Sequence, residues 1–168
     1  RLKETGILGK REGMDHGVVG IVGRAIGRVL DARVDFPYAA YRDFPFEIPI
    51  DSSGDVFARY QIRIRELRHS FALILSVLEQ IPAGEIHVAF DESAIAKNSF
   101  AVSVVEGWRG DVVVAVITDA HGKISRVMVR DASYLNWAAV PYAVKGNMVP
   151  DFPLINKSFD LSYSGYDR

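Results

Sequence analysis

The strongest hydrophobic pattern in this chain is a stripe of apolar residues that recurs every three or four positions between residues 55 and 81. Its members are Tyr60, Ile64, Leu67, Phe71, Ile74, Leu78 and Ile81. This spacing is that of one face of an α-helix, and Pro82-Ala83-Gly84 ends it. At ~1.5 Å per residue the helix is about 40 Å long. We therefore expect a member of a helical bundle whose partner helices lie partly outside this chain.

Three runs rich in β-branched residues follow at 100–105, 111–118 and 123–130. They are separated by Gly107-Trp108-Arg109-Gly110 and Asp119-Ala120-His121-Gly122, which have the composition of hairpin turns. The pattern predicts a three-stranded antiparallel meander. Because the middle run is apolar at consecutive positions from Val112 to Ile117, we expect both faces of the sheet to be covered.

Weaker patterns predict the rest of the chain. We expect short helices at 12–16, 133–144 and 148–155, with an irregular tail from Asn156. Three prolines between residues 35 and 51 predict an extended loop packed by aromatic side chains, because proline removes an amide donor and disfavours helix before it. The side chains of residues 51–55 can cap the long helix that follows. Together the elements predict an α+β fold that is mainly helical.

Four closely spaced glycines, Gly17, Gly20, Gly23 and Gly27, superficially resemble a phosphate-binding loop. No β-run precedes them and no Lys-Ser/Thr follows, so the dinucleotide-binding and P-loop contexts both fail. We expect them to permit turns and close backbone packing instead.

The composition excludes several classes of function. The 168 residues are 49% hydrophobic and 24% charged with a net charge of −1, which suits one globular domain and disfavours nucleic-acid binding. No apolar run approaches the roughly 20 residues of a transmembrane helix, so membrane association would go through partner subunits. The chain has no cysteine, and its four histidines lack ligand spacing, so we expect no metal site.

The C-terminal segment, residues 157–168, resembles the signature of nickel–iron hydrogenase large subunits of the membrane-complex type. There an Asp-Pro-Cys-x-x-Cys element supplies thiolates to the metals. Ser162 and Gly165 stand at the two cysteine positions here. A serine hydroxyl is a poor nickel ligand at neutral pH and glycine has no side chain, so the resemblance implies a hydrogenase scaffold that has lost its metal centre.

The loss of these ligands makes the chain similar to a second branch of the same superfamily, the 49-kDa large subunit of respiratory complex I. This resemblance implies a large-subunit-like bundle in which residues 1–168 form the C-terminal part of a longer domain. Around Asn136-Trp137 and Lys145-Gly146-Asn147 the chain is closer to the formate hydrogenlyase and hydrogenase-four type. The residues that carry the resemblance are 1–6, 20–27, 31–33, 37–41, 54–60, 106–110, 134–137 and 145–151.

Two groups of candidate site residues come from the resemblance. Glu106 and Arg109 match a Glu-x-x-Arg-Gly element that brings an arginine over the metal centre in hydrogenases. An alternative interpretation is an exposed hairpin turn in which Arg109 only pairs with an acid such as Asp160. Asp160, Ser162 and Tyr163 belong to the former ligand segment. With Glu106 and Arg109 they would form a polar pocket for a quinone head group or a proton relay. Equally, the segment could simply thread through the bundle, with Asp160 salt-bridged and Tyr163 buried.

Charged residues elsewhere have structural interpretations. Arg24, Asp31 and Arg33 match a pattern shared by both branches, and we expect them to fix loops near the interface with a small, cluster-bearing subunit. A solvated surface is the other interpretation. The arginines along the long helix, Arg59, Arg63, Arg65 and Arg68, are expected to form a solvated face, with a docking surface as the alternative.

The resemblance implies a subunit of a complex I-related or formate-hydrogenlyase-related electron-transfer complex, without a nickel–iron centre of its own. Its expected partners are a small iron–sulfur subunit and membrane-arm subunits, at the cytoplasmic face of the inner membrane. A quinone and a neighbouring iron–sulfur cluster are the expected cofactors of the intact complex. Two alternatives stay open: a non-catalytic scaffold, and a piece of a true nickel–iron hydrogenase large subunit.

Overall fold

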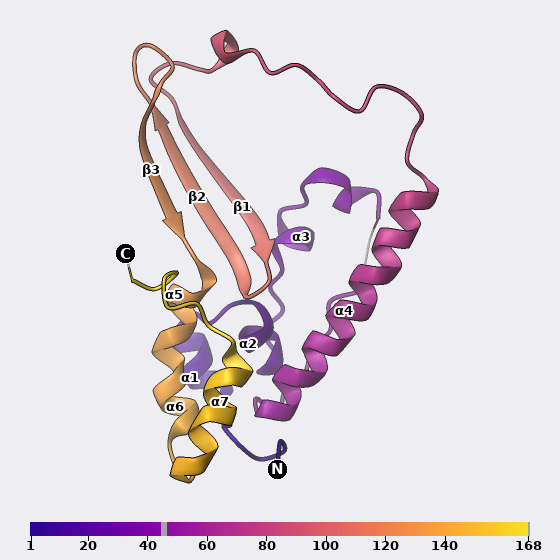
Figure 1. Cartoon of the computed structure of the whole chain (residues 1–168). Coiled ribbons are helices and arrows are strands. Elements are labelled where there is room, and N and C mark those ends of the chain that lie inside the picture. Colours follow the sequence, from indigo (N-terminus) through magenta and orange to yellow (C-terminus); the bar gives the residue numbers. More distant parts are fainter. Residues whose placement is uncertain (45–46, 168) are drawn as a thin grey trace.

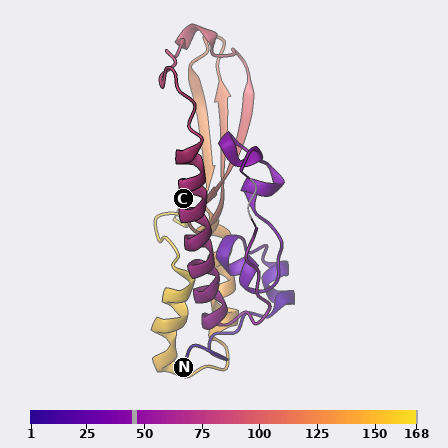
Figure 2. The ribbon, with the colours of Figure 1, turned by 90° about the vertical axis from the view of Figure 1, so that its right-hand side faces the viewer.

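The structure is a computed structural model that describes residues 1–44 and 47–167. A helical body holds both termini, and a three-stranded sheet and a long helix diverge from it (Figures 1 and 2). The described elements are α1 (Lys10–Asp15), α2 (Gly20–Ala25), α3 (Ala32–Asp35), η1 (Ala39–Arg42), α4 (Val56–Glu79), η2 (Glu92–Ala94), β1 (Phe100–Gly107), β2 (Gly110–Thr118), β3 (Ile124–Arg130), α5 (Ala132–Asn136), η3 (Trp137–Ala139), α6 (Val140–Val144), η4 (Val149–Asp151) and α7 (Phe152–Phe159).

The expected long helix is α4. It begins after Asp55, whose Oδ1 accepts a hydrogen bond from the Ala58 amide at 2.7 Å. Such a cap satisfies an amide that has no partner within the helix. The first turns are buried through Val56, Ala58 and Ile62. Beyond them the stripe is open, with Leu67, Phe71, Ile74 and Leu78 between 44% and 60% exposed.

The expected meander is confirmed, with β2 between β1 and β3 and both pairings antiparallel. At the tip of the first hairpin Glu106 pairs with Asp111 and Gly107 with Gly110. The expectation that both faces are covered is wrong for the described part of the chain, because the residues of β2 after Gly110 are only half-buried. Body helices reach only one end of the sheet, where α2 and α5 contact β2 (Figure 1).

The core of the helical body joins segments that are far apart in the sequence. Leu8, Val18, Val22 and Ile26 from the N-terminal part are fully buried against side chains from the C-terminal helices. Ile155 and Phe159 of α7 are 0% and 1% exposed. Burial of this apolar surface is what fixes the short helices, since helices of five or six residues are not stable alone.

Several local expectations were wrong. Helix α2 was not expected, because Gly20 and Gly23 both weaken helices. The tail is not irregular from Asn156, since α7 continues to Phe159 and ends where Asp160 adopts a left-handed conformation with φ 55°. The loop at 35–51 contains η1, and Phe36 is 61% exposed rather than packed. Residues 45–46 of that loop lie outside the described residues.

Candidate functional site

A buried cluster of charges around Arg24 joins α2, α4, β1 and the start of α3. Arg24 is 1% exposed, and its Nη1 lies 3.0 Å from Glu106 Oε1 and 3.3 Å from Asp31 Oδ2. Its Nη2 lies 2.7 Å from Oε1 of Glu66 on α4. Arg33 holds the other side of Asp31 through Nε at 2.8 Å and Nη2 at 2.6 Å. The solvated-surface interpretation of Arg24, Asp31 and Arg33 is therefore wrong, and Glu66 is a member that sequence reasoning missed.

Burial sets the protonation behaviour of this cluster. Desolvation raises the pKa of Glu106 above its ordinary value, although Arg24 opposes the shift, because a buried carboxylate loses its water. Burial alone would lower the pKa of Arg33, but the hydrogen bond and the charge of Asp31 raise it overall. The cluster thus couples four elements, and the pKa values of Glu106 and Arg33 depend on their charged neighbours.

The tip of the β1–β2 hairpin reaches the end of α7. Trp108 Nε1 donates to Asp160 Oδ2 at 3.0 Å, and Arg109 Nε donates to the main-chain carbonyl of Asp160. Lys157 Nζ lies 2.9 Å from Asp160 Oδ1. Burial would raise the pKa of Asp160, but the hydrogen bonds from Trp108 and Lys157 lower it overall, because they favour the ionised form. Arg109 thus binds the main-chain carbonyl of Asp160, while Trp108 and Lys157 bind the Asp160 carboxylate.

The hairpin tip is fixed against α2 by close backbone contact. Gly20 has φ +62°, and a Cβ built there would lie 2.2 Å from the Arg109 carbonyl oxygen. The buried side chain of Asn136 bridges the two segments, accepting from the Val19 amide at 2.9 Å and donating to the Arg109 carbonyl at 3.4 Å. The expectation that these glycines permit close packing therefore holds at Gly20.

Two arginines of α4, Arg59 and Arg63, hold this helix against the end of α7. Arg59 is 0% exposed and donates to the carbonyls of Gly54 at 2.7 Å and Gly6 at 2.9 Å, and to Ser158 Oγ at 2.9 Å. Arg63 donates to the carbonyls of Ser158 at 2.6 Å and Phe159 at 3.2 Å, which lie at the end of α7. The expected solvated face holds for Arg65 and Arg68, which are exposed, and is wrong for Arg59 and Arg63. The signal that was missed is their position on the same turns as buried Ala58 and Ile62.

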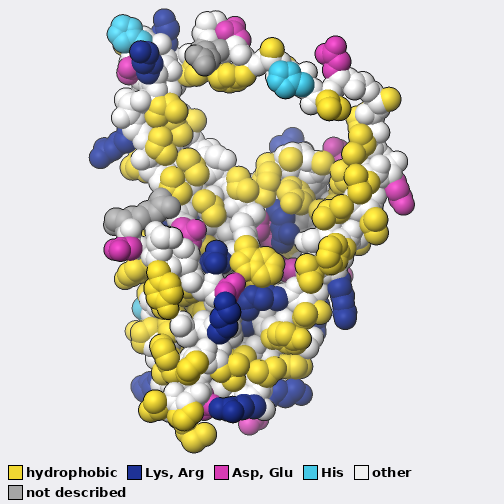
Figure 3. Space-filling model, in the orientation of Figure 1, with side chains coloured by type: hydrophobic (Ala, Val, Ile, Leu, Met, Phe, Trp, Pro, Cys, Tyr) yellow, Lys and Arg dark blue, Asp and Glu magenta, His cyan; other side chains and the backbone are white. Residues whose placement is uncertain are grey.

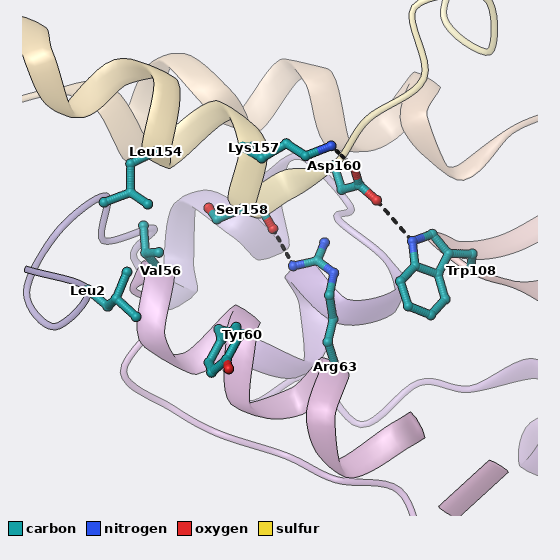
Figure 4. A pocket seen from close by; sticks show the side chains of 9 residues that line it. All are labelled: Leu2, Val56, Tyr60, Arg63, Trp108, Leu154, Lys157, Ser158 and Asp160. Atoms are coloured by element: carbon teal, nitrogen blue, oxygen red, sulfur yellow. Dashed lines mark hydrogen bonds and ion pairs between the residues drawn. The ribbon is translucent and has the colours of Figure 1, made fainter. Parts of the chain in front are cut away.

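A cavity of about 330 Å³ lies between α4, α7 and the hairpin tip (Figure 4). Tyr60 and Trp108 supply aromatic rings, and Arg63 of α4 faces Lys157 and Asp160 at the end of α7. The apolar side chains of Leu2, Val56 and Leu154 close the far end. An aromatic slot with a few fixed polar groups suits a flat, partly polar ring.

The tail after Asp160 forms a compact turn. Ser162 is tied down by its amide, which donates to Ser133 Oγ at 3.0 Å, while its own Oγ accepts from the Gly165 amide at 3.1 Å. Tyr163 is 73% exposed, so its expected burial is wrong, and its ring centroid lies 5.2 Å from that of Trp137.

Gly165, the second position that the resemblance aligns with a cysteine, is crowded. A Cβ at Gly165 would lie 2.8 Å from Oδ1 of Asp131, the carboxylate that caps α5. A cysteine there would require Asp131 to move.

The five residues of the expected polar pocket fall into different surroundings. Glu106 lies in the Arg24 cluster, Arg109 and Asp160 meet at the hairpin tip, and Ser162 and Tyr163 belong to the terminal turn. Among residues 1–44 and 47–167, no group of His, Cys, Asp and Glu side chains is arranged to hold a metal ion. No helix of the described residues is long and apolar enough to span a bilayer.

The comparisons with known proteins agree with one another. The family model described as "Respiratory-chain NADH dehydrogenase, 49 Kd subunit" matches residues 1–103 and 93–168. The chain is 32% identical to an NADH-quinone oxidoreductase subunit of Solibacter usitatus, over all of this chain and 47% of that protein. It is 34% identical to formate hydrogenlyase subunit 5 of Escherichia coli K12, over 92% of this chain and 27% of the relative.

A solved structure shares the fold. A chain of the membrane-bound sulfane sulfur reductase, described as an archaeal respiratory membrane complex, superposes with a TM-score of 0.90 at 30% identity, covering 100% of this chain and 47% of its own. The present chain thus spans about half the length of such relatives or less. It belongs to the family of the 49-kDa subunit of respiratory-chain NADH dehydrogenase and has the fold of that subunit.

Proposed function

We propose that this chain works as a peripheral subunit of a membrane-bound electron-transfer complex of the complex I type, without a nickel–iron centre of its own. Its relatives include subunits named for NADH–quinone oxidoreduction and for formate hydrogenlyase. The proposed partners are a small subunit that carries an iron–sulfur cluster and membrane-arm subunits at the cytoplasmic face of the inner membrane. The chain supplies part of the acceptor site, and electrons reach it from the partner's cluster.

The observation that carries the proposed site is the cavity between Tyr60 and Trp108. A quinone head group is a flat ring with two carbonyl oxygens, so it would stack on the Trp108 face and accept hydrogen bonds from Arg63 or Lys157. Asp160 stays ionised because its pKa is lowered, and it keeps Trp108 and Lys157 in place. This role belongs to the intact complex, and we expect no turnover by this chain alone.

The test is a steady-state quinone reductase assay of the intact complex with a short-chain quinone. Trp108→Ala should raise KM for the quinone by about threefold to tenfold, the loss expected for one aromatic contact, with less effect on kcat. The matched control is Arg68→Ala, which removes an exposed side chain of α4 outside the cavity lining. An unchanged KM in a fully assembled Trp108→Ala complex would contradict the site.

A scaffold role is the second candidate, favoured by the large exposed apolar face of α4. In that case the assembled complex would contain this subunit in full amount, yet would bind no quinone-site inhibitor and reduce no quinone. The same assay therefore separates the two functions.

A further inference from the structure

The Arg24 cluster has unequal numbers of positive and negative groups. Its three carboxyl groups are those of Asp31, Glu66 and Glu106, whose side chains are 0%, 13% and 4% exposed. Its two guanidinium groups are those of Arg24, which is 1% exposed, and Arg33, which is 14% exposed. If all five were ionised, their summed charge would be −1 in a largely buried place, and Arg63 of α4 would offset part of it on the side of Glu66. Such a charge is costly, and protonation of one carboxyl group removes it.

Hydrogen bonding and burial together favour one carboxyl group as the site of the proton. Asp31 accepts two bonds from the Arg33 side chain and one from the Arg33 amide at 3.0 Å, which favours its ionised form. Glu66 lies 2.7 Å from Arg24 Nη2 and retains the greatest exposure to water of the three.

Glu106 is the more deeply buried of the two glutamates, with its side chain 4% exposed against 13% for Glu66, although the buried Oε1 of Glu66 accepts no hydrogen bond from the described residues. It is nearly fully buried, and its bond to Arg24 Nη1 is shared with Asp31 and with the Leu30 carbonyl at 3.2 Å. Its other oxygen accepts only the Ala32 amide at 3.0 Å.

We propose that Glu106 is a proton-binding residue, which holds the one proton that balances the charges of the Arg24 cluster and releases it to solvent when the charge around the cluster changes. The raised pKa of Glu106, caused first by desolvation, agrees with this assignment. On release the O–H bond of the Glu106 carboxyl group breaks, the proton goes to water and the electron pair stays on the carboxylate, so no oxidation state in the chain changes.

The groups around Glu106 come from every neighbouring element, and together they set its charge. They are Arg24 of α2, Asp31, Arg33 and Asp35 at α3, Tyr38 before η1, Glu66 of α4, and Asp111 of β2 with its partner Arg130 of β3. The hydroxyl of Tyr38 accepts the Glu106 amide at 3.1 Å. Asp111 is the cross-strand neighbour and is paired with Arg130, so it adds little net charge.

The position of Glu106 links this proton to the proposed acceptor site. It lies two residues before Trp108 on the same hairpin, and Arg24 connects it to Glu66, which is one helical turn from Arg63 on α4. A change in the charge of Glu106 therefore alters the electrostatic potential at two walls of the cavity, at Trp108 and at Arg63. The proton-binding assignment itself does not depend on what the cavity binds.

The direct test is carbon-13 NMR of the complete protein with glutamate labelled at the side-chain carboxyl carbon. The signals of Glu106, Glu66 and exposed Glu79 are assigned by their loss in Glu106→Gln, Glu66→Gln and Glu79→Gln. We expect the Glu106 signal to titrate at a higher pH than that of Glu79, the internal reference. The proposal is overturned if Glu106 titrates with Glu79 or below it, or if Glu66 is the group with the raised midpoint.

A second measurement uses stability and does not require the cavity to function. A carboxyl group whose pKa is raised in the folded state stabilises the fold at low pH and loses that contribution as pH rises through the folded-state pKa. The wild-type protein should therefore lose stability relative to Glu106→Gln as pH rises through this window in urea denaturation. A difference that does not change with pH would contradict the proposal, whatever the result of the quinone assay.

Discussion

At the level of single residues, the site depends on arginines that lie inside the protein. A guanidinium group has five N–H donors in a rigid plane, so it can satisfy several main-chain carbonyls at once. Arg59 does this for Gly54 and Gly6, and its carbon Cζ lies 4.4 Å from the centroid of the Phe159 ring. Burial and the nearby charge of Arg63 lower the pKa of Arg59, so its place in the core depends on these acceptors.

Replacement of Arg59 tests this role. Arg59→Met keeps the apolar stem but leaves three buried acceptors without their donor, so we expect the free energy of unfolding to fall by about 3 kcal/mol or more. Arg68→Met, on the exposed part of the same helix, should change it by less than about 0.5 kcal/mol. Urea denaturation measures both, and equal effects would show that Arg59 contributes nothing beyond an exposed arginine.

At the level of elements, the contact between α2 and the β1–β2 hairpin determines where Trp108 and Arg109 lie. The hairpin was predictable from its turn composition, and so was the long helix from its apolar stripe. The helix α2 was not, because two of its six residues are glycines and local propensity opposes it. It forms because its side chains are buried on all sides. A glycine stands at position 20 because the Arg109 carbonyl lies too close to leave room for a Cβ.

Two glycines separate backbone strain from crowding at this contact. Gly17 and Gly20 have similar φ values of +65° and +62°, but a Cβ at Gly17 would meet nothing within 4 Å. Gly17→Ala should therefore cost only about 1 kcal/mol for the left-handed conformation. Gly20→Ala should cost about 1–3 kcal/mol more, because the Arg109 carbonyl must move.

Thermal unfolding of the two variants provides the comparison. The fluorescence of Trp108 should change in Gly20→Ala and stay constant in Gly17→Ala, with Trp108→Phe identifying its contribution. Equal destabilisation of the two variants would mean that the close approach at Gly20 does not constrain the hairpin.

At the level of the whole molecule, the apolar surface is divided between a packed body and an open upper part. Hydrophobic side chains gather along α4 and on the sheet, on either side of the hollow below the segment that joins α4 to β1 (Figure 3). Phe71, Leu75 and Leu78 are each at least 59% exposed. Exposed apolar surface of this extent is typical of an interface, which agrees with the expectation that α4 needs partners outside the described chain.

Assembly of the complex tests this surface. Phe71→Ser should lower the amount of this subunit in the intact complex, because it removes apolar area from the interface, while the stability of the separate chain changes little. Arg65→Ser is the control, since six residues place it about 120° away around the helix. Native gel analysis of both variants measures assembly, and a normal yield for Phe71→Ser would mean that this face of α4 stays uncovered.

Features that depend on residues close together in the chain could be predicted from the sequence, whereas features that depend on residues far apart needed the tertiary structure. The sequence alone determined the long helix and the meander, because these follow from periodicity and turn composition, and it showed that Ser162 and Gly165 offer no thiolate at the positions that the resemblance aligns with cysteines. Only the tertiary structure decided that Arg59 is buried, that Glu66 and Glu106 share Arg24, and that Trp108 reaches Asp160. Those pairs lie 42 to 99 positions apart in the chain, from Arg24–Glu66 at the short end to Arg59–Ser158, and only the packing of the folded body brings them together.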